Sequence, residues 1–314
     1  MMTILLFILL GFSFRNVVDC SNVDGFNDIT DDEKKEWKWK IEDEHPCTIQ
    51  RLTLEELFDQ FGPLGVPALH PYPLVITGTH KMDNYKEFAY RCSKGNITSL
   101  TFTPDFTILT SSSNSFSDHR REYKLGDYIS DISTKEILPH VHHANESWYF
   151  FGETHSKVWK DQLMQYYPLP PCTSCMIPGD VALSFGIGHT GSGVQWHTHG
   201  PGFAQTLHGR KHWILYDDKT KPPMFHADLH TTRHWMEEVY TKLPDKQRPF
   251  ECTLHPFDLL YFPNEWYHAT LNLDPYTAFV SSFTSEHKFI NDQITLQQTK
   301  KSKKGFIQPM KRSP

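Results

Sequence analysis

The feature that most constrains this fold is a set of three histidines that are far apart in the sequence. His197 and His199 stand two positions apart in a Trp-His-Thr-His segment, and His268 follows much later in a Trp-Tyr-His segment. Metal sites that keep coordination positions open use three protein ligands. We therefore predict that the three imidazoles hold a metal, with the first pair at one strand of a β-barrel and the third on a distant strand.

The second half of the chain has the pattern of a β-protein. From Val181 onward, short runs of aromatic and β-branched residues, such as the Trp-Ile-Leu-Tyr run at 213–216, recur between Gly and Pro turns. These residue types favour sheets. Many short strands with such spacing are typical of a sandwich or a barrel, so the fold class is predicted to be mainly β.

Two helices and a short strand are predicted ahead of this region. Thr53 and Glu56 have the spacing of a capping box, so a helix should begin at Thr53. Residues 73–78 are predicted to form a buried strand that ends in a turn, and residues 123–132 a second amphipathic helix. The side chains assigned to the core from the two helices are Leu54, Leu57, Phe58, Phe61, Tyr128, Ile129 and Ile132.

Residues 1–20 have the features of a secretory signal peptide. The apolar run that ends near Phe14 is too short to span a bilayer comfortably, and Val18-Asp-Cys20 supplies small or modest residues before a cleavage point. Because no Lys or Arg precedes the run, an uncleaved membrane anchor and a buried strand are the alternatives. No later stretch is apolar enough to cross a membrane, so the mature protein should be soluble inside the secretory pathway.

The sequons and the cysteines agree with that compartment. Asn96 and Asn145 each begin an Asn-x-Ser/Thr sequon and are predicted N-glycosylation sites. The chain has 6 cysteines, some of which should pair in an oxidising compartment. Cys172 and Cys175 have the spacing of a redox motif but lie in a Pro-rich loop, which favours a local structural disulfide or two unrelated thiols.

Charged segments flank the predicted domain, which spans residues 47–289. Residues 21–46 carry nine acidic residues and four lysines, and residues 290–314 are basic. Both compositions predict disorder, with contact to an anionic lipid or protein as the alternative for the basic tail. The net charge of -6 argues against a nucleic-acid partner.

Other polar residues have weaker claims to a site. His140, His142 and His143 form a second histidine cluster, for which the sequence identifies no third partner. Asp258 is expected to shape the turn before the strand at 259–262, and Asn272 has only a weak claim to the pocket.

Assembled, these segments resemble the JmjC (Jumonji C) branch of the cupin-like oxygenases that use Fe(II) and 2-oxoglutarate. The resemblance runs from about 47 to 283. It rests on His-Thr-His-Gly-Pro-Gly at 197–202, the Gly-Arg-Lys strand at 209–216, Asp-Leu-Leu-Tyr-Phe-Pro at 258–263 and His-Ala-Thr-Leu-Asn-Leu at 268–273. It implies a double-stranded β-helix, or jelly roll, with flanking N-terminal helices.

The resemblance also implies a ligand set. The wide mouth of the barrel would hold Fe(II), 2-oxoglutarate and a peptide or small-molecule substrate, with His197 and His268 as metal ligands. Lys211 would be the cation that meets the distal carboxylate of 2-oxoglutarate, since a half-buried lysine can pair with an anion that has lost its water. A surface cation beside Arg210 is the alternative for Lys211.

His199 departs from the family pattern, which has Asp or Glu at this position, and Val194 stands where some members have a hydroxyl. Three neutral imidazoles leave Fe(II) with one more positive charge than a set with a carboxylate does. They suit Zn, Cu or Ni at least as well as Fe(II). Metal binding should therefore survive the change better than oxygenase chemistry, and a pocket whose histidines only hydrogen-bond is the alternative.

Two functions are compatible with these features. The first is a lumenal 2-oxoglutarate oxygenase that hydroxylates a side chain, and the second is a catalytically inactive jelly-roll protein that binds lumenal partners. The resemblance favours the endoplasmic-reticulum lumen, with secretion as the alternative because the chain ends without a Lys-Asp-Glu-Leu-like signal. A lumenal protein is the expected partner or substrate. Histone demethylation is not expected, because that substrate is in another compartment.

Overall fold

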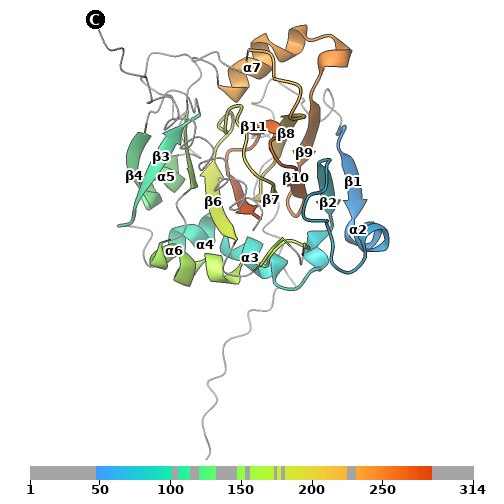
Figure 1. The fold of residues 1–314 in the computed structure, drawn as a ribbon. Helices are drawn as coiled ribbons and strands as arrows, with labels where there is room; N and C mark the ends of the chain where they lie inside the picture. The colour runs from blue at the N-terminus through green and yellow to red at the C-terminus, as the bar shows by residue number, and fades with distance from the viewer. Residues whose placement is uncertain are drawn as a thin grey trace, which may run out of the picture.

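The fold is mainly β, as the sequence predicts (Figure 1). It is seen in a computed structural model that describes residues 47–100, 105–113, 120–131, 147–152, 156–172, 175–177, 181–224 and 231–284. The strands are β1 (Gln50–Thr53), β2 (Leu74–Thr77), β3 (Thr107–Ser112), β4 (Arg120–Lys124), β5 (Trp148–Gly152), β6 (Ala182–Gly188), β7 (Gly202–His208), β8 (Lys211–Tyr216), β9 (Phe250–Leu254), β10 (Leu259–Phe262), β11 (Tyr267–Asn272) and β12 (Thr277–Phe283).

Short helices connect and cover the strands. The α-helices are α2 (Leu54–Phe61), α3 (Tyr85–Arg91), α4 (Lys94–Ser99), α5 (Leu125–Asp131), α6 (Lys157–Gln162) and α7 (Thr232–Glu238). The 3-10 helices are η4 (Thr79–Lys81), η6 (Met164–Tyr166), η7 (Tyr240–Lys242) and η8 (Asp245–Gln247). Among the described residues, no helix has the length and hydropathy that a membrane-spanning helix needs.

Two sheets pack against each other as a jelly roll. The larger has 9 strands in the order β1-β2-β10-β7-β12-β6-β5-β3-β4, and the smaller has 3 strands in the order β11-β8-β9. Rings from the two sheets meet between them: Trp213 on β8 stacks on Phe262 on β10, with 5.9 Å between centroids. The space between the sheets is therefore where side chains from distant strands converge.

Alternation along the strands decides which side chains enter that space. On β12, Phe279 lies under the ammonium of Lys211 and Phe283 contacts the ring of His199. On β8, Lys211 and Trp213 are two residues apart and both point inward, because successive side chains of a strand lie on opposite faces. The interior is thus lined by every second residue of β8, β10, β11 and β12.

The first predicted helix is confirmed. Thr53 caps α2, and its side chain and that of Glu56 form the reciprocal bonds of a capping box. Leu54 and Leu57 are buried as predicted. Phe58 is 36% exposed, so the buried stripe is narrower than the sequence pattern suggests.

The second predicted helix begins later than expected. Residues 120–124 form β4, and α5 runs over Leu125–Asp131. Tyr123 is in the strand because it pairs with Ile108 of β3, a contact that local periodicity does not reveal. Tyr128 and Ile129 are buried as predicted, and Ile132 lies outside the described residues.

Two disulfides are present among the described residues. Cys172 and Cys175 form a local bridge, which agrees with the structural disulfide expected in the Pro-rich loop. Cys47 and Cys252 form a second bridge across 205 positions. Cys92 is a buried free thiol on the described part of the chain.

Several predictions fall outside the described residues. These are the signal peptide at 1–20, the acidic segment 21–46, the basic tail 290–314, the sequon at Asn145 and the cluster of His140, His142 and His143. The other sequon is described: Asn96 lies on α4, half-buried, and its amide Nδ2 donates to the Tyr90 carbonyl at 2.6 Å. Glycosylation of Asn96 would replace that hydrogen bond, so it stays a prediction.

Gly193 permits a close approach beside β11. A Cβ atom at this position would lie 2.0 Å from the Thr270 carbonyl oxygen, so the loop that leads to His197 packs backbone against backbone. Gly193→Ala is expected to lower the melting temperature, because overpacking of this kind costs about 1–3 kcal/mol. Thermal unfolding measures the change. Gly95→Ala on α4, where a Cβ meets nothing within 4 Å, is the matched control and should not destabilise the protein.

Candidate metal centre

The three predicted histidines lie together between the sheets. His197 and His268 form an isolated β-bridge, in which the His197 amide donates to the His268 carbonyl at 3.1 Å and the His268 amide donates back at 3.0 Å. The Nε2 atoms of His199 and His268 are 3.2 Å apart. One ring nitrogen from each of the three residues lies within 4.8 Å of the others. The structure thus brings the set together, while metal binding itself stays a prediction.

A backbone carbonyl orients each of the three rings. Because a carbonyl oxygen only accepts, Nδ1 carries the proton in each imidazole and Nε2 presents its lone pair to the centre of the set. This is the arrangement in which histidines ligate metals through Nε2. The distances from Nδ1 to the carbonyl oxygen are 2.7 Å for His197 and Gln195, 2.8 Å for His199 and Gly200, and 2.9 Å for His268 and Trp266.

This donor set fits a divalent metal ion. Two lone pairs that face each other repel unless a cation lies between them. Nitrogen ligands about 2.0–2.1 Å from one ion lie about 3 Å apart, which matches the 3.2 Å between the Nε2 atoms of His199 and His268. Burial lowers the pKa of His197. Burial, and then repulsion from His197 and His199, also hold the pKa of His268 well below its ordinary value, so this imidazole is neutral near neutral pH.

Aromatic rings surround His199 and His268. The Phe262 ring is stacked 5.2 Å from the His268 ring and lies edge-on 5.1 Å from the His199 ring. Trp213 stacks on His268 at 5.7 Å, and Phe283 meets His199 at 5.0 Å. These contacts restrict rotation of the imidazoles and keep water away from one side of the centre.

Lys211 is buried in the same interior space, with 2% of its surface exposed. Its Nζ donates to the Asn272 side-chain oxygen at 2.9 Å and lies 3.8 Å from the centroid of the Phe279 ring. Among the described residues, those contacts are with an amide and a ring face and include no carboxylate. Burial lowers the pKa of Lys211 to about 7. The alternative that Lys211 is a surface cation is therefore wrong. An ammonium group buried in this position fits the role of pairing with an anionic ligand.

The lowered pKa of Lys211 predicts how stability depends on pH. The folded protein binds this proton less tightly than the unfolded chain does, so the metal-free and ligand-free protein should gain stability as the pH rises from about 7 towards 10. Below about pH 7 Lys211 is protonated in both the folded and the unfolded state, so its contribution to the free energy of unfolding no longer changes with pH. Thermal unfolding between pH 6.5 and about 10 measures how the melting temperature changes with pH. The melting temperature of Lys211→Met should change less with pH than that of the wild type. Equal slopes in the two proteins would contradict a buried ammonium.

Asn272 has a larger role than the sequence suggests. Its oxygen accepts from Lys211, and its Nδ2 donates to the Ser192 hydroxyl at 3.0 Å. Gly188 makes room for this pair, since a Cβ there would lie 2.1 Å from the Asn272 amide nitrogen. The sequence does contain a signal for this role. Side chains alternate between the two faces of a strand, so His268 and Asn272, four residues apart on β11, lie on the same face.

Asp258 shapes the turn, as predicted, and its contacts among the described residues do not include the three candidate ligands. Its carboxylate accepts from the His255 amide at 3.0 Å and pairs with Arg51 at 3.1 Å. The backbone at Val194 is held by hydroxyl groups of other residues: its amide donates to the Thr270 hydroxyl at 3.0 Å. The Thr232 hydroxyl donates to its carbonyl, also at 3.0 Å.

Comparison with known proteins agrees with this fold. Residues 79–287 match the family described as the Cupin-like domain. The JmjC domain-containing protein 8 of Homo sapiens is 32% identical over 77% of this chain and 86% of its own length. Its counterpart in Rattus norvegicus is 35% identical over 77% of this chain and 84% of its own length. A lysine-specific demethylase of Arabidopsis thaliana is 31% identical over 33% of this chain and 12% of its own length.

The chain therefore belongs to the cupin-like, JmjC domain family. Within that family it is similar over most of its length to JmjC domain-containing protein 8 of mammals. With the demethylase, in contrast, it shares a segment that covers 12% of the larger protein.

Proposed function

We propose that this protein is a 2-oxoglutarate oxygenase of the protein hydroxylase type, which binds Fe(II) through His197, His199 and His268. The observation that carries the proposal is the pair of features between the sheets. Three imidazoles, each held at Nδ1 by a backbone carbonyl, bring one ring nitrogen apiece within 4.8 Å of the others, and a buried lysine nearby has no carboxylate partner among the described residues. A divalent metal and a dicarboxylate would satisfy both.

Each part of the chain has a defined task in this proposal. The carbonyls of Gln195, Gly200 and Trp266 hold the three rings in the ligating tautomer. Lys211, oriented by Asn272, would bind the distal carboxylate of 2-oxoglutarate. When bound, Fe(II) with 2-oxoglutarate and dioxygen supplies the oxidation chemistry, in which a substrate side chain is hydroxylated and succinate and carbon dioxide are released.

The proposed location is the lumen of the endoplasmic reticulum, with a lumenal protein as substrate or partner. A signal-like N-terminus, two sequons and two disulfides support an oxidising, secretory compartment. Secretion is the alternative location. Expression of the full chain with a C-terminal fluorescent tag, followed by endoglycosidase digestion, tests the location; a cytosolic, endoglycosidase-resistant protein would contradict it.

A second function is favoured by one observation, which is the imidazole of His199 in place of the family carboxylate. Without an anionic protein ligand the metal keeps its full charge, and Zn or another divalent ion suits three imidazoles at least as well as Fe(II). The protein would then be a catalytically inactive jelly-roll protein that binds lumenal partners through its loops.

Succinate release separates the two functions. Purified protein loaded anaerobically with Fe(II) is mixed with 2-oxoglutarate and oxygen, and succinate is measured with and without added lumenal peptides. The oxygenase proposal expects slow succinate formation that requires Fe(II) and that peptide substrate accelerates. Tight Zn(II) binding together with no succinate under any condition would favour the interaction protein.

A further inference from the structure

The Cys47–Cys252 disulfide joins the start of the domain to the wall of the barrel beside the metal centre. Cys252 is on β9, is fully buried, and pairs in register with Trp213 of β8. The Trp213 ring in turn stacks on the His268 ring at 5.7 Å. One backbone pairing and one ring contact therefore separate the disulfide from a predicted metal ligand.

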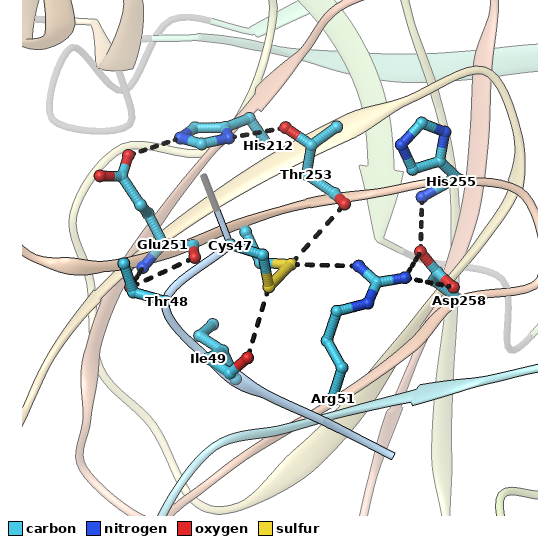
Figure 2. Close-up of a disulfide and its surroundings, with 10 residues drawn as sticks. Cys47, Thr48, Ile49, Arg51, His212, Glu251, Thr253, His255 and Asp258 are labelled. Carbon is cyan, nitrogen blue, oxygen red and sulfur yellow. Dashed lines mark hydrogen bonds and ion pairs between the residues drawn. A yellow bond between two sulfur atoms is a disulfide. The ribbon is translucent and has the colours of Figure 1, made fainter. Parts of the chain in front are cut away.

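The N-terminal segment is fastened to β9 at this point. The Thr48 amide donates to the Glu251 carbonyl at 2.8 Å, and the Glu251 amide donates to the Thr48 hydroxyl at 2.9 Å (Figure 2). β9 is an edge strand of the smaller sheet, where β8 is its only strand neighbour among the described residues. The disulfide therefore secures the outer strand of a three-stranded wall whose other two strands carry Lys211 and His268.

The two sulfur atoms differ in their surroundings. Cys47 is half-buried, whereas Cys252 is buried and has the Arg51 guanidinium beside it, with Nη1 3.5 Å from its sulfur (Figure 2). Asp258 holds the guanidinium in place through the other nitrogen, Nη2, at 3.1 Å. A thiolate is stabilised by an adjacent cation, and a better-stabilised thiolate is displaced faster in thiol–disulfide exchange.

We propose that the Cys47–Cys252 disulfide is a redox-sensitive lock on the metal centre, opened by a dithiol reductant. A thiolate of the reductant attacks the Cys47 sulfur, the bond to Cys252 breaks, and Cys252 leaves as a thiolate beside Arg51. The second thiol of the reductant then resolves the mixed disulfide on Cys47. Two electrons pass to the protein, which ends with two reduced cysteines, and the dithiol becomes a disulfide.

Opening the lock removes the covalent attachment of the start of the domain to β9 and leaves the hydrogen bonds between Thr48 and Glu251 to hold it there. The β9–β8 pairing then loses its outer support, and the contact of Trp213 with His268 loosens. Weaker metal binding follows, because groups that hold ligands in place contribute about 10-fold or more to metal affinity. This coupling rests on the proposed metal site, whereas the order in which the disulfides are reduced does not.

The first test compares the two disulfides of the full, oxidised chain. The protein is reduced stepwise with dithiothreitol, alkylated and mapped by mass spectrometry. Cys47 and Cys252 should become labelled several-fold faster than Cys172 and Cys175, which are both buried. Equal labelling rates, or faster labelling of the Cys172–Cys175 pair, would overturn the proposal.

Variants of Arg51 separate its chemical role from a structural one. Arg51→Gln should slow reduction of Cys47–Cys252 by roughly 3-fold or more, because the leaving thiolate loses its cation. Arg51→Lys should keep a rate near that of the wild type. If Arg51 had only a structural role, Arg51→Gln would instead speed reduction of the disulfide, because loss of the Arg51–Asp258 ion pair would loosen the region. Faster reduction in Arg51→Gln would therefore contradict the proposed role of Arg51.

The second test measures the coupling with Co(II) as the probe, by competition with a chelator. Selective reduction of Cys47–Cys252, and separately Cys47→Ser, should each lower Co(II) affinity about 10-fold, and reoxidation should restore it. The double variant Cys172→Ser/Cys175→Ser is the matched control and should leave the affinity unchanged. Equal affinity in the oxidised and reduced protein would overturn the coupling. No Co(II) binding in either state would instead contradict the metal site itself, with the order of reduction still decided by mass spectrometry.

Discussion

Lys211→Met is expected to weaken binding of 2-oxoglutarate by about 30-fold, because a hydrogen bond to a charged group contributes about 2 kcal/mol. The same substitution should raise the melting temperature of the ligand-free protein. A buried ammonium whose contacts are an amide oxygen and a ring face is costly, and methionine fills a similar volume without charge. Isothermal titration calorimetry of the Fe(II)-loaded protein and thermal unfolding measure the two effects.

The opposite signs of these two effects exclude simple misfolding as their cause. Lys219→Met removes the same charge from an exposed position after β8 and should change neither quantity. Unchanged affinity for 2-oxoglutarate in Lys211→Met would show that Lys211 does not contribute to binding this ligand. A lower melting temperature would show that its ammonium has a stabilising partner.

His268→Ala is expected to lower affinity for divalent metals by more than about 100-fold, since perturbing groups that merely support a ligand already costs 10- to 100-fold. The loss should extend to 2-oxoglutarate, because the proposed chelate needs the metal. His268 lies on β11, and both its amide and its ring contribute to the centre, but alanine keeps the backbone bridge to His197. Chelator competition with Co(II) or Zn(II) measures the affinity.

The control for this variant is His255→Ala. His255 is exposed and takes part in the Asp258 turn through its amide, so its removal should leave metal affinity unchanged. Metal binding that persists with wild-type affinity in His268→Ala would mean that the three histidines are a hydrogen-bonded cluster and not a ligand set.

Local sequence signals predicted the parts of the fold that local interactions determine. The capping box at Thr53 and Glu56 defined the start of α2, because both bonds form within one turn. The start of α5 was predicted too early, since Tyr123 is drawn into β4 by pairing with Ile108. Periodicity along one segment contains no information about a partner strand.

The candidate site, like the fold, was predicted only where residue type and motif identify it. The three histidines follow from their residue type and from the family resemblance, and the structure places them together. The contact of Lys211 with Phe279 depends on the register of β12, where a β-bulge shifts the pairing between Ala278 and Phe279. The Cys47–Cys252 bridge joins positions 205 residues apart. Neither a register shift nor a pairing at that distance can be derived from one sequence.

The central claim is that three imidazoles and Lys211 form one pocket for a metal and 2-oxoglutarate. The most direct measurement is an anaerobic titration of the protein with Fe(II) and then with 2-oxoglutarate, which follows the charge-transfer absorbance of the chelate, with His199→Asp in parallel. We expect a band in the wild type, lost in His268→Ala. A band in His199→Asp but none in the wild type would mean that the pocket is intact but disabled by His199, and the interaction-protein alternative would then replace the oxygenase proposal.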